Sequence, residues 1–298
     1  MQNDRDIIKK LESIDLNDVN IEYIRALLFQ LKSVQSIKSE LSPENIIIRC
    51  RRGRNYTSRI DMSYKPLCLC QSYQRATLPN QTAFYGVLSD DVDHWENARA
   101  IGISECSALS DVESGREYMS VSLWKIKEPI TTYCIVSSNS YLDVDVSGNR
   151  LLGDLRNFYT NKFPDNEDAS SASDFIVREF SKLVPEGHDC EYKISATWAD
   201  MILNTVGFEA IAYPSVQLGG QAGLNFALRP EVADSKLILD KIISFCLYKS
   251  KKSKEINEVW ESYFDCINKC MVKNNNLLSD LKEVSYKLGV NANELQLL

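Results

Sequence analysis

The chain has 298 residues, of which 44% are hydrophobic and 25% are charged, and it is long enough for one large domain or one domain with extensions. Its net charge of −7 argues against a general nucleic-acid coat, and no apolar run approaches the roughly 18 residues of a membrane span. The N-terminus is polar and lacks the hydrophobic segment of a signal peptide. We therefore expect a cytoplasmic protein that contacts neither membrane nor nucleic acid.

Nine cysteines are spread along the chain, and none of them forms a Cys-x-x-Cys pair. A zinc site needs ligands at closer spacing, and only His94 and His188 are available to help. We expect no metal site, and thiols that pack as small hydrophobic side chains in a reducing compartment.

The first half of the chain predicts a helical hairpin followed by strands. Apolar residues at three- and four-residue spacing predict helices over 4–16 and 20–38, so residues 1–42 are expected to form a helical extension. Strands are expected over 46–51, 82–88 and 118–126, a long loop over 53–80, and a helix over 95–109.

The second half predicts more helix than strand. One or two strands are expected over 132–146, helices over 150–161 and 172–183, and strands over 210–213 and 225–228. Further helices are expected over 237–248, 254–272 and 276–288, which make 232–298 a second helical extension. This mixed order of helices and strands indicates an α+β fold.

Residues 192–230 are the most informative part of the sequence for function, and they are expected to form a helix followed by two short strands. Ser195 is the expected N-cap of a helix whose apolar face carries Trp198, Met201, Ile202 and Val206. Gly207 suits the left-handed position just past its end. The strands that follow end beside Ser215 and Asn225, where binding residues are often found.

These residues resemble the end of a known family. Tyr192-Lys-Ile-Ser195, the helix, Gly207-Phe-Glu-Ala-Ile-Ala-Tyr-Pro-Ser215 and Gly223-Leu-Asn225-Phe-Ala-Leu228 are similar to the way RES domains close. RES domains are bacterial proteins with an ADP-ribosyltransferase-like fold that consume NAD. The resemblance implies an ADP-ribosyltransferase-like split β-sheet core flanked by helices, with a catalytic domain over 43–231.

Upstream segments extend the resemblance over about residues 45–230. Arg49 follows Ile46-Ile-Ile at the end of the first strand, and Gln74-Arg75 to Phe84-Tyr85-Gly resembles the family's Gly-Arg-x-Asn, loop, Phe-Tyr-Gly pattern. Ile103-Ser-Glu105 resembles its glutamate-bearing helix. Gln74 and Thr77 depart from the family's glycine and asparagine.

The catalytic glutamate has two candidates. The step from Tyr85 to Glu105 is longer than in compact family members, and Glu96 lies at a more typical distance. Glu105 is preferred because small and apolar residues precede it, which implies an insertion near residues 90–96.

The resemblance assigns a role to each candidate residue, with NAD as substrate. Glu105 would stabilise the positive charge that develops on the ribose when nicotinamide leaves. Arg49 and Arg75 would bind the two phosphates, and Tyr85 would stack on nicotinamide. Ser215 and Asn225 would hydrogen-bond the ribose or the phosphates. Glu105, Arg49 and Tyr85 are therefore the expected catalytic residues.

The expected function is that of an NAD glycohydrolase or NAD phosphorylase, a toxin whose usual partner in the family is a helix-turn-helix antitoxin. Alternatives are an ADP-ribosyltransferase acting on a protein, and a non-catalytic nucleotide-binding or interaction module on the same fold. The arginines at 49, 51, 52, 54 and 59 leave a third alternative, an RNA-contacting patch. The terminal segments are free to pack on the core, form a homo-oligomer or bind a partner.

Overall fold

The computed structural model describes residues 3–53, 56–89, 95–135, 150–163, 167–215, 223–249, 256–265 and 270–272. Its strands are β1 (Ile37–Leu41), β2 (Ile46–Arg52), β3 (Phe84–Ser89), β4 (Gly115–Ile126), β5 (Ile130–Cys134), β6 (Ala210–Ser215), β7 (Gly223–Leu228), β8 (Leu237–Lys249), β9 (Ile256–Asp265) and β10 (Cys270–Val272). The helices are α1 (Asp4–Glu12), α2 (Ile21–Leu28), α3 (Arg59–Met62), α4 (Glu96–Cys106), α5 (Arg150–Lys162), α6 (Glu167–Ser181), α7 (Lys193–Asp200) and α8 (Pro230–Lys236), with short turns η1 (Leu67–Leu69), η2 (Ala108–Asp111), η3 (Asp189–Tyr192) and η4 (Met201–Val206).

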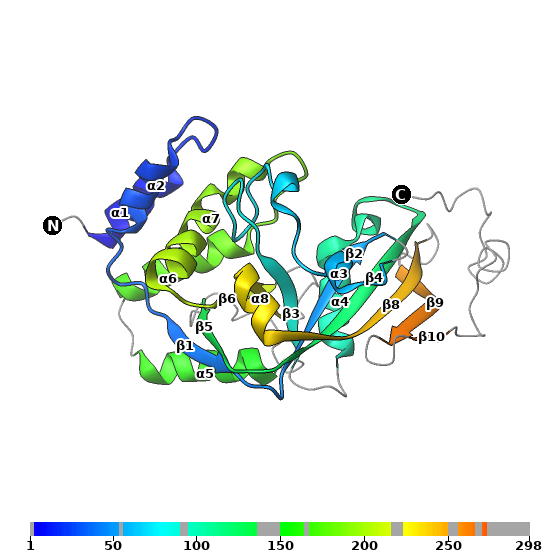
Figure 1. Ribbon diagram of the computed structural model, residues 1–298. Helices are drawn as coiled ribbons and strands as arrows, with labels where there is room; N and C mark the ends of the chain where they lie inside the picture. Colours follow the sequence, from blue (N-terminus) through cyan, green and yellow to red (C-terminus); the bar gives the residue numbers. More distant parts are fainter. Residues whose placement is uncertain are drawn as a thin grey trace.

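The described strands form one mixed sheet in the order β1-β5-β6-β7-β3-β2-β4-β8-β9-β10 (Figure 1). All neighbouring pairs are antiparallel except β5 and β6, which run parallel. The fold is therefore α+β, as the order of elements predicted. None of the described helices has the length and apolar character needed to cross a bilayer.

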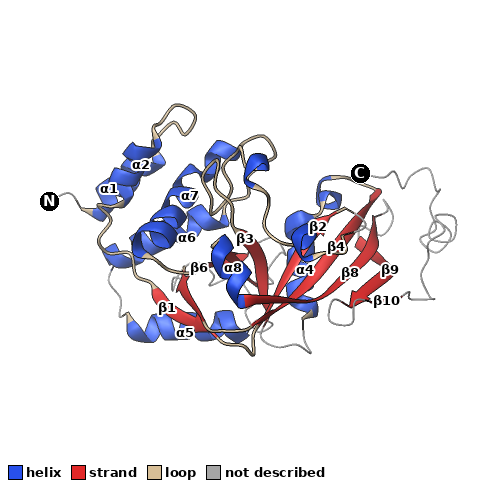
Figure 2. Ribbon diagram, viewed as in Figure 1, coloured by secondary structure: helices blue, strands red, loops and turns tan. Residues whose placement is uncertain are grey.

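Helices cover the two faces of the sheet unequally (Figure 2). On one face, α1, α2, α6 and α7 pack together against β6 and β7, and α4 packs separately against β2 and β3. On the other face, buried residues of α3, α5 and α8 share a core with Phe84 and Trp124, whose rings meet edge to face at 5.0 Å. The space between the two helical groups on the first face is where the candidate site lies.

Two neighbouring strands separate along their length. β2 pairs with β3 only at Ile46–Ile48, opposite Val87–Ser89. Beyond that point β2 continues to pair with β4, while residues 84–87 of β3 pair with β7. The sheet thus divides at Arg49 and Tyr85, and the backbone edges there are not joined to each other.

The helices expected over 237–248 and 254–272 are wrong, because the described residues of these ranges form β8, β9 and β10. Leu237–Lys249 is a mostly apolar run interrupted by Asp240, Lys241 and Ser244, and such a run fits a largely buried strand as well as a buried helix. β8 pairs along the whole of β4, so tertiary pairing decides the outcome. The helix expected over 276–288 lies outside the described residues.

The helix expected over 20–38 ends at Leu28, and residues 37–41 form β1 instead. The Asp4 carboxylate accepts hydrogen bonds from the backbone N–H groups of Lys32 and Ser33, at 3.3 and 2.9 Å. These N–H groups are therefore not available for the hydrogen bonds of a helix. Ser195 is not an N-cap either: it lies inside α7, where its hydroxyl donates to the Tyr192 carbonyl. Gly207 does occupy the predicted left-handed position, with φ of 90°.

Strands β2 to β7 and helices α1 and α4 to α7 lie where the sequence predicts them, with ends shifted by a few residues, whereas α3 and α8 form where no helix was predicted. The long loop over 53–80 holds only α3 and η1 among its described residues. Of the strands expected over 132–146, β5 is described to Cys134, and residues 136–149 lie outside the described part. The apolar face expected after Ser195 is buried at Trp198 and Ile202, whereas Val206 is 63% exposed.

Candidate functional site

A cavity of about 490 Å³ opens where β2 and β3 separate. Its walls come from these strands, from α4, from the loop at residues 72–75 and from η3. The residues that line it are Ile48, Arg49, Cys50, Ser72, Tyr73, Gln74, Arg75, Tyr85, Gly86, Val87, Gly102, Glu105, Cys106, Asp189, Tyr192, Tyr213 and Asn225. The volume falls within the range of cavities that hold small-molecule ligands.

Glu105, in the last turn of α4, is held by two strand residues. Its Oε1 accepts hydrogen bonds from the Ser215 hydroxyl at the end of β6 and from Asn225 Nδ2 in β7, the latter at 2.9 Å. Its second oxygen, Oε2, has no hydrogen-bond partner among the described residues. The carboxylate is therefore fixed at one oxygen and available at the other.

Two glycines let α4 lie close enough to the sheet for these bonds to form. A Cβ at Gly102 would stand 2.6 Å from Cys50 Sγ, and a Cβ at Gly223 would stand 2.2 Å from Ile101 Cδ1. Both distances are too short for real atoms, so an alanine at either position would require the Cys50 or the Ile101 side chain to shift at the present helix–sheet spacing. These contacts link the local sequence to the position of Glu105.

Arg49 spans the division in the sheet. Its Nη1 donates to the Tyr85 carbonyl, and the guanidinium lies 5.2 Å from the centre of the Phe84 ring. Its Nε is buried without a hydrogen-bond partner among the described residues. Burial lowers the pKa of Arg49 to about 10, so the group remains a cation at neutral pH. A buried cation with an unused donor beside a cavity is suited to an anionic ligand.

The phenol of Tyr85 is held away from bulk water. Its hydroxyl accepts from Ala76 N at 3.2 Å and lies 3.1 Å from Thr77 Oγ1, in a turn closed by the Gln74–Thr77 bridge. Burial raises the pKa of Tyr85 to about 12, so the phenol is neutral. With its hydroxyl occupied, the part of Tyr85 that remains for a ligand is the ring.

Arg75 has structural contacts as well as a place on the cavity wall. Nη1 and Nη2 donate to the carbonyls of Phe180 and Lys182 at the end of α6, the second at 3.0 Å. Its guanidinium lies 5.1 Å from the centre of the Tyr192 ring. No carboxylate of the described residues forms a salt bridge with it, so its charge still acts on the cavity.

The structure therefore brings the candidate residues together. One cavity is lined by Arg49, Arg75, Tyr85, Glu105 and Asn225. Ser215 is not among the lining residues, but its hydroxyl donates a hydrogen bond to Glu105. Glu96 does not line this cavity; it is exposed in the first turn of α4. The geometry favours Glu105 over Glu96.

Sequence reasoning missed several lining residues. Tyr192 and Tyr213 stood in the quoted motifs without an assigned role, and Asp189 and Cys106 were given no role either. Burial raises the pKa of Cys106 to about 11, and its thiol donates to the Cys50 carbonyl. Cys106 is therefore a neutral thiol and not an activated nucleophile.

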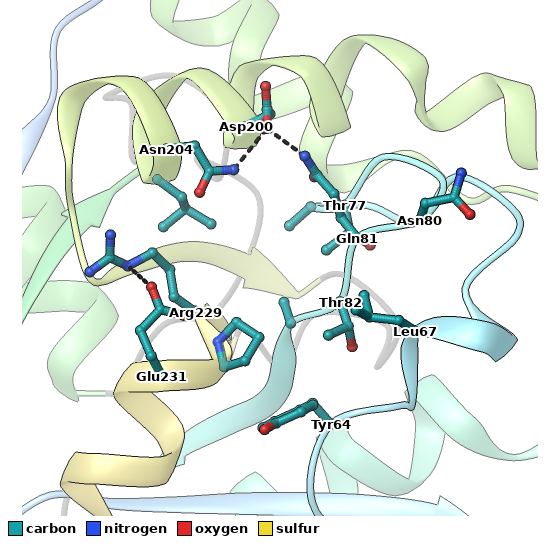
Figure 3. Close-up of a pocket in the computed structure, with 14 residues that line it drawn as sticks. Tyr64, Leu67, Thr77, Asn80, Gln81, Thr82, Asp200, Asn204, Arg229 and Glu231 are labelled. Atoms are coloured by element: carbon teal, nitrogen blue, oxygen red, sulfur yellow. Dashed lines mark hydrogen bonds and ion pairs between the residues drawn. The ribbon is translucent and has the colours of Figure 1, made fainter.

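A second cavity of about 400 Å³ is lined in part by residues from the 76–83 segment (Figure 3). Its polar groups largely bind one another: Asp200 Oδ1 accepts from Gln81 at 2.7 Å and from Asn204 at 2.8 Å, and Arg229 pairs with Glu231 at 3.1 Å. The other Asp200 oxygen pairs with Arg25 of α2 at 2.8 Å. This network connects elements and offers fewer free charges to a ligand than the first cavity.

Comparison with known proteins adds no identity. No model of a known protein family matches the chain, and no curated protein matches it either. In the described part of the chain, no group of three or more His, Cys, Asp or Glu side chains could hold a metal ion.

Proposed function

We propose that this protein cleaves the nicotinamide–ribose bond of NAD, and that its sheet and helices are a variant of the ADP-ribosyltransferase-like fold. The observation that carries the proposal is the anchored Glu105 carboxylate in a cavity shared with the buried Arg49 cation. The order of motifs along the chain, which resembles RES domains, supports the same reaction.

The reaction needs few protein groups. When the C–N bond breaks, its electron pair leaves with nicotinamide, which becomes neutral, and the ribose develops positive charge at C1′. Glu105, with Oε1 fixed by Ser215 and Asn225, would present Oε2 to that charge. Water or phosphate then adds to C1′, and a proton is released to solvent.

Arg49 and Arg75 would contribute to binding the phosphates of NAD in different ways. Arg49 has an unused buried donor and suits a phosphate oxygen directly. Arg75 already donates to two carbonyls, so its contribution to the phosphates is mainly through its charge. The Tyr85 ring, with its hydroxyl occupied, supplies a face for nicotinamide.

The alternative of an RNA-contacting patch loses support from the contacts of its arginines. Arg51 donates to the Asp61 carbonyl, Arg52 pairs with Glu117 at 3.3 Å, and Arg59 pairs with Asp234 at 3.1 Å. The charges of Arg52 and Arg59 are thus paired with carboxylates and the Arg51 side chain is held by a carbonyl, while Arg54 lies outside the described residues. In a cell, free NAD breakdown would require restraint, for which an antitoxin that covers the cavity is our proposed partner.

The test is nicotinamide release from NAD by the purified protein. Glu105→Gln keeps the shape of the side chain and removes its charge, so we expect release to fall on the order of 10²-fold or more with an unchanged melting temperature. Glu96→Gln is the matched control in the same helix and should retain full activity. Loss of activity in Glu96→Gln alone would reverse the assignment, and no release by the wild-type protein would favour a non-catalytic nucleotide-binding module.

A further inference from the structure

The cavity has two walls of different chemistry. One wall, from β2, β3, β7 and α4, carries Arg49, Tyr85, Asn225 and Glu105. The second wall, from the 72–75 loop and η3, is formed by Tyr73, Arg75, Asp189 and Tyr192. The proposed reaction uses the first wall and the charge of Arg75, and it leaves the aromatic part of the second wall without a role.

Tyr192 and Arg75 form a stacked pair that the surrounding structure holds in place. The Arg75 guanidinium lies 5.1 Å from the ring centre and is tied to the end of α6 through the Phe180 and Lys182 carbonyls. Tyr192 ends η3 and immediately precedes α7, whose residues are all buried. The pair is therefore a preformed flat surface at the cavity, with little conformational freedom to lose on binding.

Such a surface suits a planar base. Aromatic rings and guanidinium planes both stack on nucleobases, and every base has a face that can stack. Beside the pair, Asp189 contributes a carboxylate to the same wall, and a carboxylate accepts hydrogen bonds from an exocyclic amino group. A stacking surface with an acceptor at its edge matches the adenine end of a dinucleotide.

We infer that the wall of Tyr192, Arg75 and Asp189 is the subsite for the adenine base, with Tyr192 as its specificity-determining residue. The inference rests on the proposed function for the placement of the two ends: if Glu105 lies beside the nicotinamide ribose, the second wall is the part of the lining that remains for the other base. The protein would then select a dinucleotide over nicotinamide mononucleotide, which lacks the adenosine half.

The experiment compares nicotinamide release from NAD and from nicotinamide mononucleotide by the full-length chain. Tyr192→Leu keeps apolar volume and removes the aromatic face, so we expect kcat/KM for NAD to fall about tenfold or more, the scale of a lost base stack. Cleavage of the mononucleotide should stay within about twofold, which also shows that the variant is folded. Tyr192→Phe keeps the ring and should restore NAD activity, and Tyr23→Ala is a control at a 50% exposed tyrosine of α2.

Other outcomes would overturn the inference while the proposed function stands. An equal loss for both substrates would make Tyr192 a part of the nicotinamide side or of the fold, and no loss for either would remove it from binding. If the wild-type protein cleaved neither compound, the proposed function would fail and calorimetry with AMP would decide the subsite. Weaker AMP binding by Tyr192→Leu than by wild type would support the subsite, and equal affinity or no binding by the wild type would reject it.

Discussion

At the scale of single residues, the site depends on how one carboxylate is held. Ser215 and Asn225 were expected to bind the substrate, but in the structure both donate to Oε1 of Glu105. Donors on one oxygen fix the direction of the other, and a fixed charge needs little reorganisation when the transition state forms. Their contribution is therefore expected in the chemical step.

Asn225→Ala tests this positioning role. We expect kcat to fall about 10- to 100-fold, the scale of one lost hydrogen bond to a charged group, with KM for NAD changed by less than about threefold. Steady-state nicotinamide release measures both constants. Asn204→Ala is the matched control, because Asn204 makes a similar bond to Asp200 outside the cavity, and its activity should be normal. If Asn225→Ala instead raised KM and left kcat unchanged, the positioning role would be wrong and Asn225 would be a substrate-binding residue.

The identities of the site residues could be predicted from the sequence, but their contacts could not. Arg49, Tyr85, Glu105 and Asn225 stand in a recognisable order of motifs, and the cavity contains all four. Which donor meets which acceptor depends on strand pairing between segments more than 100 residues apart, as for Glu105 with Ser215 and Asn225. The carbonyl contacts of Arg75 are of the same kind, since nothing near position 75 indicates where α6 ends.

At the scale of secondary-structure elements, the spacing between α4 and the sheet sets the reach of Glu105. Gly102→Ala should gain up to about 1 kcal/mol of helix propensity but should lose about 1–3 kcal/mol from overpacking against Cys50. We expect a net loss of stability and of activity, measured by urea unfolding and by nicotinamide release.

A second substitution makes this prediction specific. Cys50→Ala removes the Sγ atom that a Cβ at position 102 would approach to 2.6 Å. The double variant Gly102→Ala with Cys50→Ala should therefore be more stable than the sum of the single effects, with a coupling of about 1–2 kcal/mol. Additive effects would show that another contact fixes the position of α4.

The Asp200 network joins α2, α7 and the 78–82 turn, and its stabilisation depends on pH. Burial opposes the charge of Asp200, but hydrogen bonds from Gln81, Asn204 and Arg25 outweigh burial and lower the pKa of Asp200 below its usual 3.8. Because the folded-state pKa is lowered, the stabilisation is full above the usual value and is lost as pH falls through the lower one.

Asp200→Asn should thus cost about 1–3 kcal/mol at neutral pH, and the difference from wild type should shrink below about pH 4. Thermal unfolding at a series of pH values measures this. Asp234→Asn is the control, since its pair with Arg59 is largely exposed and should contribute little. If the difference in stability between Asp200→Asn and wild type stayed constant down to pH 2, the stabilisation would not depend on ionisation of the Asp200 carboxylate and the prediction would be wrong.

Element prediction succeeded where local signals agreed and failed where pairing decided. The run from Leu237 to Lys249 has the apolar content of a buried helix, yet it lies between β4 and β9. The segment after Leu28 satisfies a helical pattern, but its N–H groups bind Asp4 instead. In both cases the segment's conformation is determined by a partner that is distant in the sequence, and a local sequence pattern contains no information about that partner.

At the scale of the whole molecule, β8 is part of the central sheet. It pairs with β4 from Gly115 to Ile126, and Ile242, Phe245 and Leu247 are each about 1% exposed. A chain that ends at Lys236 should therefore be insoluble rather than more active, because β4 would lose its partner. Expression followed by centrifugation and size-exclusion chromatography measures this.

Two point variants on β8 compare a buried position with an exposed one and leave the strand itself in place. Ile242→Ser places a hydroxyl in the core and should destabilise the protein by several kcal/mol, on the order of 3. Ile238→Ser, at a 47% exposed position, should change stability by less than about 1 kcal/mol. Soluble, active protein truncated after Lys236 would show that β8 is dispensable.

The strand order also determines when the candidate site can form during synthesis. Glu105 is bound by Asn225, 120 residues later in the chain, and β7 must enter the sheet between β6 and β3 before that bond exists. At a translation rate of about 5–20 residues per second, this interval lasts roughly 6–24 seconds. A nascent chain in which β7 has not yet been synthesised cannot hold the Glu105 carboxylate in place, so translation delays the formation of the candidate site.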